Sequence, residues 1–282
     1  MISILLASAF LATTPVVADT VVDLSRGDRV VMENIAGEVR VVTWDRDELQ
    51  VRTTDDSRSA LSVRRSGSRL ELRPDDSKGR RRGVEVEIRL PSWVDIEISG
   101  LSLDVRVNGV GGALAVTTVR GDIRVENTTG VVSLRSVQGE IDVVDASGTI
   151  VVSSQGDDVR MRRVSGSVQV HSGTGDLTLT DMEAHSVRAE TQDGDITFSG
   201  SLMSGGEYYF SVHDGDATIV IPAGTGARVK ASVFDGEFTS DFPVLVDRFT
   251  GGREFEFVVG DGGARLDISV FDGEIQLRRQ GR

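Results

Sequence analysis

The chain has 282 residues, of which 39% are hydrophobic and 27% are charged, and this balance is typical of a globular protein and excludes an intrinsically disordered one. Its formal net charge of −13 at pH 7 argues against nucleic acids and anionic membrane surfaces as general partners, because both would be repelled. Cysteine is absent, which excludes disulfides, thiol catalysis, cysteine-based zinc sites and lipid attachment through an N-terminal cysteine.

Residues 1–18 are apolar or small throughout, and Asp19 follows them. We predict that this segment is a secretory signal peptide, cleaved near the small residue Ala18. No lysine or arginine precedes the apolar run, so the alternative is an uncleaved N-terminal anchor, although the run is short for a membrane span. The rest of the chain contains no second apolar run of this kind. We therefore expect an extracytoplasmic protein, periplasmic or secreted, with no membrane span in its mature chain.

Residues 19–107 predict a β-rich N-terminal region. A strand is expected from Gly37 to Trp44, with a return over residues 48–53 and a clearly alternating strand over residues 84–90. These strands are longer and less evenly spaced than those that follow, so the region is either a sandwich-like lobe or a widened first section of the same stack. In both cases it would cap an otherwise open strand edge. Its basic segment, Lys78–Arg82, is interpreted as a solvated loop rather than a phosphate-binding patch.

Residues 108–282 carry a nine-residue repeat that predicts a β-solenoid. Each unit begins with a turn residue, followed by a spacer and two apolar residues separated by one residue, as in Gly121-Asp122-Ile123-Arg124-Val125. Alternation of this kind predicts a short strand with one buried face, and strands this short need stacked neighbours to bury it. The regular units start at positions 112, 121, 130, 139, 148, 157, 166 and 175.

An acid follows the turn residue in every second unit, as at Asp122 and Glu140, so the chemical repeat is 140 − 122 = 18 residues. One coil is therefore predicted to contain two strands and two turns. The spacing grows to 21 residues from Gly194 to Gly215 and again from Gly215 to Gly236, which predicts larger consecutive coils. Four aromatic residues are expected to point into this wider interior: Phe198, Phe210, Phe234 and Phe238.

The recurring acids predict an acidic column along one edge of the stack, beside a column of hydroxyl residues. The candidate binding edge consists of Asp122, Glu140, Asp158, Asp176, Asp195 and Asp216. The hydroxyl column consists of Thr118, Ser136, Ser154 and Ser172. Equivalent positions of stacked strands would lie about 4.8 Å apart.

A row of Ca²⁺ sites is one interpretation of the acids, because hard cations prefer carboxylates. The chain lacks the Gly-Gly-x-Gly-x-Asp turn of calcium-binding β-rolls, so a solvated edge that resists aggregation is preferred. A carboxylate pair for sugar cleavage is the other interpretation, but no single pair stands out and the chain has only two Trp and two Tyr. We therefore expect no catalytic residue, no cofactor and no metal site.

The three histidines, His171, His185 and His213, occupy different positions within their repeats. They are predicted to be isolated turn or surface residues and not to form a metal cluster. At the end of the chain, strands near residues 255–259, 266–270 and 275–277 are expected to close the stack. Arg278, Arg279 and Arg282 would then place charge on the final strand edge and oppose end-to-end association.

Several motifs resemble a known family. They are Gly37-x-Val39-x-Val41, the segment Trp44-Asp45-x-Asp47-Glu48-Leu49-x-Val51, Ile88-x-Leu90-Pro91 and the later Gly-Asp or Gly-Glu turns. In their order and number they resemble the bacterial putative-adhesin family of β-strand-repeat proteins, largely defined as a domain of unknown function. The resemblance covers most of the mature chain. It implies an exported all-β repeat protein, sometimes linked to the cell envelope, and it supplies no catalytic residues.

The functional expectation is an exported, non-catalytic binding or scaffolding module of the cell envelope. Its partner would be an envelope protein or a polymer surface, recognised by ladders of outward side chains; the sequence does not specify the oligomeric state. Two alternatives remain at this stage. One is an accessory protein of envelope-stress signalling, and the other is a polysaccharide-acting β-helical enzyme.

Overall fold

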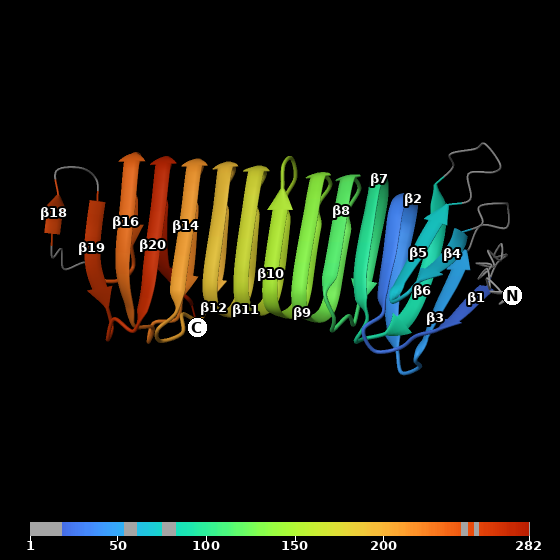
Figure 1. Ribbon diagram of the computed structural model, residues 1–282. Coiled ribbons are helices and arrows are strands. Elements are labelled where there is room, and N and C mark those ends of the chain that lie inside the picture. The colour runs from blue at the N-terminus through green and yellow to red at the C-terminus, as the bar shows by residue number, and fades with distance from the viewer. Residues whose placement is uncertain (1–18, 54–60, 75–82, 244–247, 251–253, 282) are drawn as a thin grey trace, which may run out of the picture.

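The computed structural model describes residues 19–53, 61–74, 83–243, 248–250 and 254–281. All regular elements in these ranges are β-strands, and they form one elongated stack (Figure 1). The predicted all-β solenoid is therefore confirmed. The predicted signal peptide, residues 1–18, and the basic segment Lys78–Arg82 lie outside the described residues. No helix in the described part of the chain is long and apolar enough to cross a membrane.

The regular coils consist of two strands and two corners, as predicted. Four long elements each run through both strands of a coil: β9 (Ile123–Gln138), β10 (Ile141–Ser154), β11 (Val159–Thr174) and β12 (Leu177–Asp193). Neighbouring coils pair in parallel, with Ile141 opposite Ile123 on one side and opposite Val159 on the other. The step is 141 − 123 = 18 residues, which confirms the coil length expected from the acid spacing.

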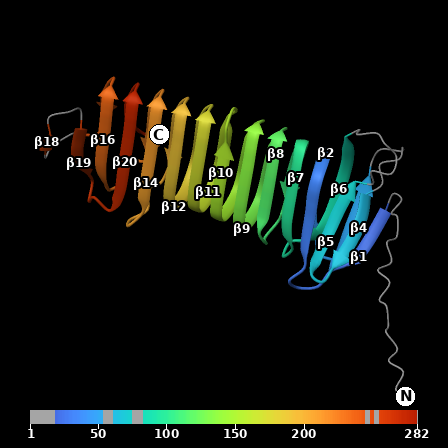
Figure 2. The same ribbon diagram turned by 45° about the horizontal axis from the view of Figure 1, so that its top comes forward.

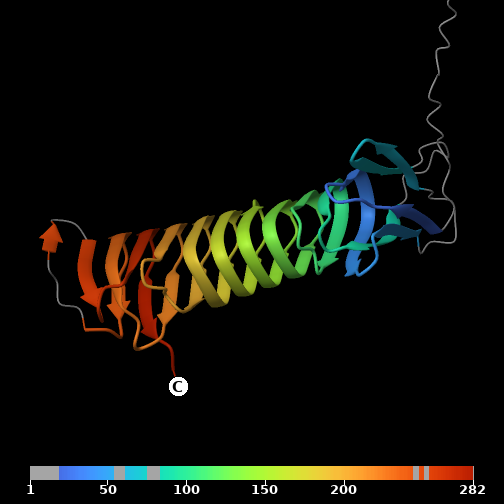
Figure 3. The same cartoon turned by 60° about the horizontal axis from the view of Figure 1, so that its bottom comes forward.

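The coils stack into two opposed faces, here called face A and face B (Figure 3). Face A contains the second halves of β9 to β12 together with β8 (Leu114–Arg120), β14 (Glu207–Asp214), β20 (Ala264–Asp272) and β16 (Ala227–Asp235). Face B contains the first halves of β9 to β12 together with β13 (Ile196–Gly200), β15 (Ala217–Ile221), β21 (Ile275–Arg279) and β17 (Phe238–Ser240). Both faces bury alternate residues against each other, and the apolar cluster continues from Leu24 to Leu277.

Glycine at the corners is required both by backbone conformation and by space. Gly148 has a φ of +119°, and a Cβ atom there would lie 2.1 Å from the carbonyl oxygen of Gly130 on the preceding coil. No side chain can occupy that position without moving the backbone. Coil-to-coil contact at this corner is therefore as close as the backbone permits.

The predicted hydroxyl column lies inside the stack and not on its surface. Thr118, Ser154 and Ser172 are fully buried. Each hydroxyl donates to a backbone carbonyl at the corner that follows: Thr118 to Arg120 at 2.9 Å, Ser154 to Asp157 at 2.8 Å and Ser172 to Thr174 at 3.0 Å. These side chains stabilise the turn from within, because a buried carbonyl would otherwise lack a donor.

The aromatic prediction was right for two residues and wrong for a third. Phe198 and Phe210 are fully buried and pack against each other with ring centroids 5.1 Å apart. Phe238 is half-buried. Phe234 is 71% exposed, because its neighbour Val233 takes the inward position of that strand. A large aromatic side chain is thereby placed on the outer surface.

The N-terminal region continues the stack and covers its end. Its elements are β1 (Asp19–Asp23), β2 (Arg29–Trp44), β3 (Glu48–Thr53), β4 (Leu61–Ser66), β5 (Arg69–Pro74), β6 (Val84–Pro91) and β7 (Asp95–Asn108). β2 pairs in parallel with β7 on one side and with β5 and β6 on the other. Antiparallel pairs of β1 with β3, β3 with β6 and β4 with β5 complete this end. The predicted boundary after residue 107 falls at the end of β7, and the core is continuous across it.

The last coil is inserted between two earlier ones, which the sequence did not predict. β20 pairs in parallel with both β14 and β16, and β21 pairs with both β15 and β17. The outer end is formed instead by antiparallel β18 (Arg248–Thr250) and β19 (Glu254–Val259). Arg278 and Arg279 therefore lie on a strand that is paired on both sides. The prediction that they place charge on the final strand edge was wrong. Arg282 is outside the described residues. The C-terminus lies beside the stack and not at its tip (Figure 1, Figure 2).

The inward face can be tested with two neighbouring residues. Val125 is completely buried, whereas Arg124 is exposed and pairs with Glu126 and Asp142 on the surface. We expect Val125→Asp to lower the free energy of unfolding by more than about 4 kcal/mol, because an unpaired charge would enter a dry core. Arg124→Ala should cost less than about 1 kcal/mol. Urea denaturation of both variants measures the difference, and equal midpoints would contradict the assigned faces.

The buried hydroxyl of Tyr208 should make the free energy of unfolding depend on pH. The hydroxyl of Tyr208 donates to the Ala184 carbonyl at 2.6 Å and accepts from the Met203 N–H at 2.8 Å. Burial raises the pKa of Tyr208 above its ordinary value of 10.0. The folded state therefore holds this proton more tightly, and the contribution to stability is present below pH 10 and lost as the pH rises through the raised pKa.

We expect Tyr208→Phe to cost about 1–3 kcal/mol at neutral pH, because two buried backbone groups lose their partner. The variant should also lose less stability than the wild type between neutral pH and the pH range above 10. Tyr209→Phe, on the adjacent outward position, is the matched control. Urea unfolding followed across this pH range makes the measurement, and parallel pH profiles for all three proteins would contradict the assignment.

Candidate functional site

The predicted acidic edge lies along the corner that joins face A to face B. Along this corner every acid of the predicted edge except Glu140 accepts a hydrogen bond from the backbone of the next coil. The Asp195 N–H donates to Asp176 Oδ1 at 2.9 Å, and the Asp216 N–H donates to Asp195 Oδ1 at 2.8 Å. In the same way a backbone N–H donates to an aspartate Oδ1 of the preceding coil in four further pairs, given with the donor first: Asp122 to Asp104, Glu140 to Asp122, Asp176 to Asp158 and Glu274 to Asp216. We call this series the carboxylate ladder.

The ladder gives the recurring acids a structural role. A backbone N–H that points out at a corner has no partner within its own coil, and the carboxylate of the neighbouring coil supplies one. Glu140 differs from the rest: its carboxylate pairs with Arg160 at 2.6 Å, and the same guanidinium binds Asp158 at 2.8 Å. A binding role for this edge stays a prediction. Within the described residues, no group of three or more His, Asp or Glu side chains could hold a metal ion.

The opposite corner is stabilised by charge pairing. Asp145 and Arg163 occupy equivalent left-handed positions of successive coils, with φ values of 54° and 53°. Their side chains form two hydrogen bonds of 2.6 and 2.7 Å. This pairing lowers the pKa of Asp145 and raises the pKa of Arg163. Asp145 and Arg163 therefore neutralise each other at this corner.

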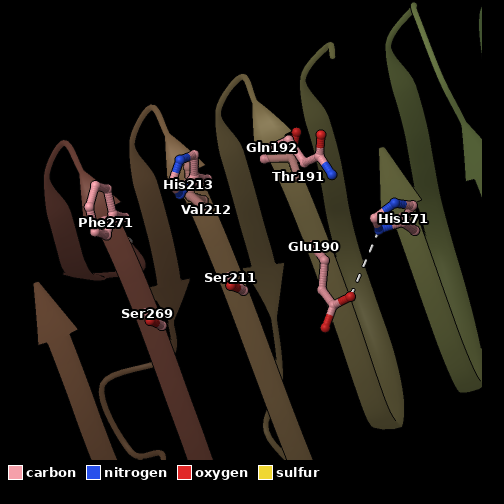
Figure 4. Close-up of a pocket in the computed structure, with 9 residues that line it drawn as sticks. All are labelled: His171, Glu190, Thr191, Gln192, Ser211, Val212, His213, Ser269 and Phe271. Carbon is pink, nitrogen blue, oxygen red and sulfur yellow. Dashed lines mark ion pairs between the residues drawn. The ribbon is translucent and has the colours of Figure 1, made fainter. Parts of the chain in front are cut away.

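A groove crosses the outer surface of face A near the carboxylate ladder (Figure 4). Four outward residues lie in register across it: His171, Glu190, Ser211 and Ser269. The groove has a volume of about 690 Å³, which falls within the usual range of ligand sites. The small side chains of Ser211 and Ser269 form the floor of the groove, and longer side chains such as those of Glu190 and His213 form its sides.

A stack of aromatic rings borders this groove on the side of the corner. The rings of His213 and Phe271 lie 4.7 Å apart, and those of Phe271 and Phe234 lie 4.6 Å apart. Both Phe234 and Phe271 are exposed. On the other side of the serines, the Arg188 guanidinium lies 4.4 Å from the Tyr209 ring centroid and pairs with Glu190. Further along that side, the pairing of Lys230 with Glu254 raises the pKa of Lys230.

The aromatic stack belongs to a longer row of equivalent positions along face A that hold no Asp, Glu, Lys or Arg. Strand pairing places one such residue on each successive coil of face A. We call it the uncharged row: Leu101, Val119, Val137, Gln155, Gly173, Gln192, His213, Phe271 and Phe234. Leu101 is 69% exposed at one end and Phe234 is 71% exposed at the other. Gly173, in the middle of the row, is buried.

The position directly after the uncharged row changes character along the stack. In the first coils it is polar or basic, as at Ser102, Arg120 and Gln138. In the last coils it is always aspartate, and we call these residues the aspartate row: Asp193, Asp214, Asp272 and Asp235. The aspartate row is distinct from the carboxylate ladder, which lies two positions further along each corner.

The sequence did not predict that two histidines share one site. His171 and His213 both line the groove, and His171 Nδ1 lies 3.8 Å from Glu190 Oε2. His185 is exposed and lies outside the groove. The histidines were expected to be isolated because they occupy different repeat positions. His171 on β11 and His213 on β14 line the same groove because it crosses several coils and two outward positions of each strand.

Comparison with known proteins gives a family match. The family described as Toastrack DUF4097 matches residues 28–278, which includes both the N-terminal end and the coils. A putative adhesin from Bacteroides fragilis NCTC 9343 is similar at 14% identity and a TM-score of 0.44, over 92% of this chain and 95% of that chain. A putative cell adhesion protein from Clostridium sporogenes ATCC 15579 is similar at 10% identity and a TM-score of 0.27, over 95% and 100%. A search of curated proteins gives no match.

If the carboxylate ladder stabilises the corner, substitutions of one of its acids should lower the free energy of unfolding to different extents. We expect Asp195→Ala to lower the free energy of unfolding by about 1 kcal/mol, because the Asp216 N–H loses its acceptor at a corner that is open to water. Asp195→Asn keeps a side-chain oxygen and should cost less. Glu183→Ala removes an exposed acid outside the ladder and serves as the control. Chemical denaturation compares the three variants, and a loss for Glu183→Ala as large as that for Asp195→Ala would contradict the ladder's role.

Proposed function

The chain belongs to the Toastrack DUF4097 family, and from this premise we propose that it is an exported, non-catalytic binding or scaffolding module of the bacterial cell envelope. Its partner is a protein or polymer of the envelope. The apolar, small-residue segment at residues 1–18 supports export. The regular outward rows of the stack support recognition of an extended partner.

The uncharged row is the observation that carries this proposal. The chain as a whole has a net charge of −13 and 27% charged residues, yet one outward position remains without formal charge on coil after coil. Several members are exposed apolar residues, including Leu101, Val119 and Val137. Exposed apolar residues that line up across a surface are typical of interaction sites. The row is also continuous with the groove on face A.

The carboxylate ladder supports the non-catalytic part of the proposal. Glycoside cleavage needs one specific pair of carboxyl groups with distinct roles. Here the acids of the corner repeat along the stack, and most of them bind the backbone N–H of the next coil. Equivalent acids in equivalent surroundings offer no separation of acid and base.

The proposal is tested by capture of envelope material. The full chain is expressed from its own N-terminus with a C-terminal affinity tag, and the protein recovered from the extracytoplasmic fraction is used to capture components of fractionated envelopes. We expect specific capture by the wild type and a loss of at least about tenfold for the double variant Leu101→Ser, Val137→Ser, because apolar contact area is removed at the interface.

The matched control is the double variant Val131→Ser, Val151→Ser. These valines are also exposed but lie outside the uncharged row. The control should capture as well as the wild type. Equal loss in both double variants, capture of nothing, or retention of the protein in the cytoplasm would overturn the proposal.

A further inference from the structure

We propose that the aromatic end of the uncharged row, together with the aspartate row beside it, is a docking surface for a cationic polypeptide segment of an envelope partner. The inference rests on the proposed function and names the chemistry of its partner. The surface consists of His213, Phe271 and Phe234 with the flanking Asp214 and Asp272. It crosses β14, β20 and β16, which are neighbours only because the last coil is inserted between the two before it.

The aromatic rings form a preorganised contact surface. The ring planes of Phe271 and Phe234 are within 5° of parallel, and those of His213 and Phe271 are within 22°. Phe271 is 46% exposed and Phe234 is 71% exposed. Each ring limits the rotamers of the next, so little side-chain entropy remains to be lost on binding. Aromatic residues of this kind are enriched among those that dominate binding energy.

Three residues of the aspartate row, Asp193, Asp214 and Asp272, supply negative charge next to these rings. Strand pairing places Asp193, Asp214 and Asp272 at equivalent positions of consecutive coils, about 4.8 Å apart along the stack. Within the described part of the chain, no lysine or arginine forms an ion pair with these three residues, although Asp142, Asp145 and Asp158 elsewhere on the stack have arginine partners. Stacked carboxylates without counter-charges repel one another, and a bound cation would relieve that repulsion.

Rings and carboxylates together select lysine and arginine side chains. The aliphatic stems of these residues can lie over the exposed rings while their charged ends reach the carboxylates one position further along the corner. Arginine in addition forms bidentate hydrogen bonds with carboxylates. The groove floor of Ser211 and Ser269 offers hydroxyl groups to the backbone of the same segment.

The spacing between coils predicts that the surface accepts partner segments of different sequence. Successive coils repeat about every 4.8 Å, whereas an extended polypeptide advances about 3.3 Å per residue. Side chains of a segment lying along the stack therefore cannot stay in register with the rings and carboxylates. Recognition would then depend on basic composition and not on one fixed motif.

Other occupants are disfavoured by charge. A polyanionic polymer would face the aspartate row directly. A second copy of the chain bound through the same surface would oppose two aspartate rows, in a protein that already carries a net charge of −13. A neutral oligosaccharide meets no such repulsion, and the experiment therefore includes one.

The test measures binding of defined probes to the full chain by fluorescence anisotropy. The probes are a labelled peptide of alternating arginine and serine, its glutamate-and-serine counterpart and a labelled neutral maltoheptaose. We expect the arginine peptide alone to bind, and its affinity to fall by at least about tenfold on raising the salt from low to above-physiological concentration. The double variant Asp214→Asn, Asp272→Asn should weaken binding about tenfold, and so should Phe234→Ser, Phe271→Ser.

The control variant Asp181→Asn, Glu183→Gln changes the net charge by the same amount at the opposite corner of the stack. Both residues are exposed, and binding should change by less than about twofold. An equal loss in the control would mean that only overall acidity matters, and would overturn the inference. Binding of maltoheptaose instead of the peptide, or of no probe, would also overturn it. If envelope capture still depends on Leu101 and Val137 in that case, the proposed function stands and only this inference fails.

Discussion

Parallel pairing between successive coils is the constraint on which the rest of the structure depends. Because Ile123, Ile141 and Val159 lie opposite one another, every position of a coil repeats at the same place on the next. An inward apolar residue becomes part of a continuous core, and an outward residue becomes part of a row. Corner glycines such as Gly148 allow this pairing to persist through the turns. Surface chemistry on this fold is therefore organised in rows along the stack, and single side chains act as members of a series.

The same residue type serves two purposes in adjacent rows. Acids of the carboxylate ladder, such as Asp195, bind a backbone N–H of the next coil and so contribute to stability. Asp193, Asp214 and Asp272 of the aspartate row lie two positions away and are exposed, and no arginine or lysine among the described residues forms an ion pair with them. The first set recurs along most of the stack, whereas the second is confined to its last coils. The position of an acid at the corner thus decides whether its carboxylate binds the backbone of the next coil or remains exposed to a partner.

Local patterns in the sequence predicted each coil well but not the order of the coils. Alternation of apolar residues identified the inward pairs, including Ile123 and Val125, because the period of a strand is a local property. The alternation also continues to Val233 and Ser154, so that Phe234 falls outside and Ser154 inside; the predictions for these two residues failed because they followed residue type instead of the period. The spacing of 21 residues from Gly194 to Gly215 recurs from Gly215 to Gly236, yet Gly215 lies next to Gly273 and not next to Gly236. The aromatic stack depends on that order, and no local signal could have revealed it.

The inserted last coil has a consequence for the order in which the protein can form. As the chain is synthesised, each new coil from β8 up to β15 finds the preceding coil already in place. The coil of β16 and β17 does not, because β20 and β21, which lie between it and the rest of the stack, come later in the chain. A chain interrupted before residue 264 lacks the strands with which β14, β15, β16 and β17 pair on that side. Formation of the β20–β21 coil is thus the step that joins the coil of β16 and β17 to the rest of the stack, so two segments that residues 241–263 separate in the chain become neighbours only through it.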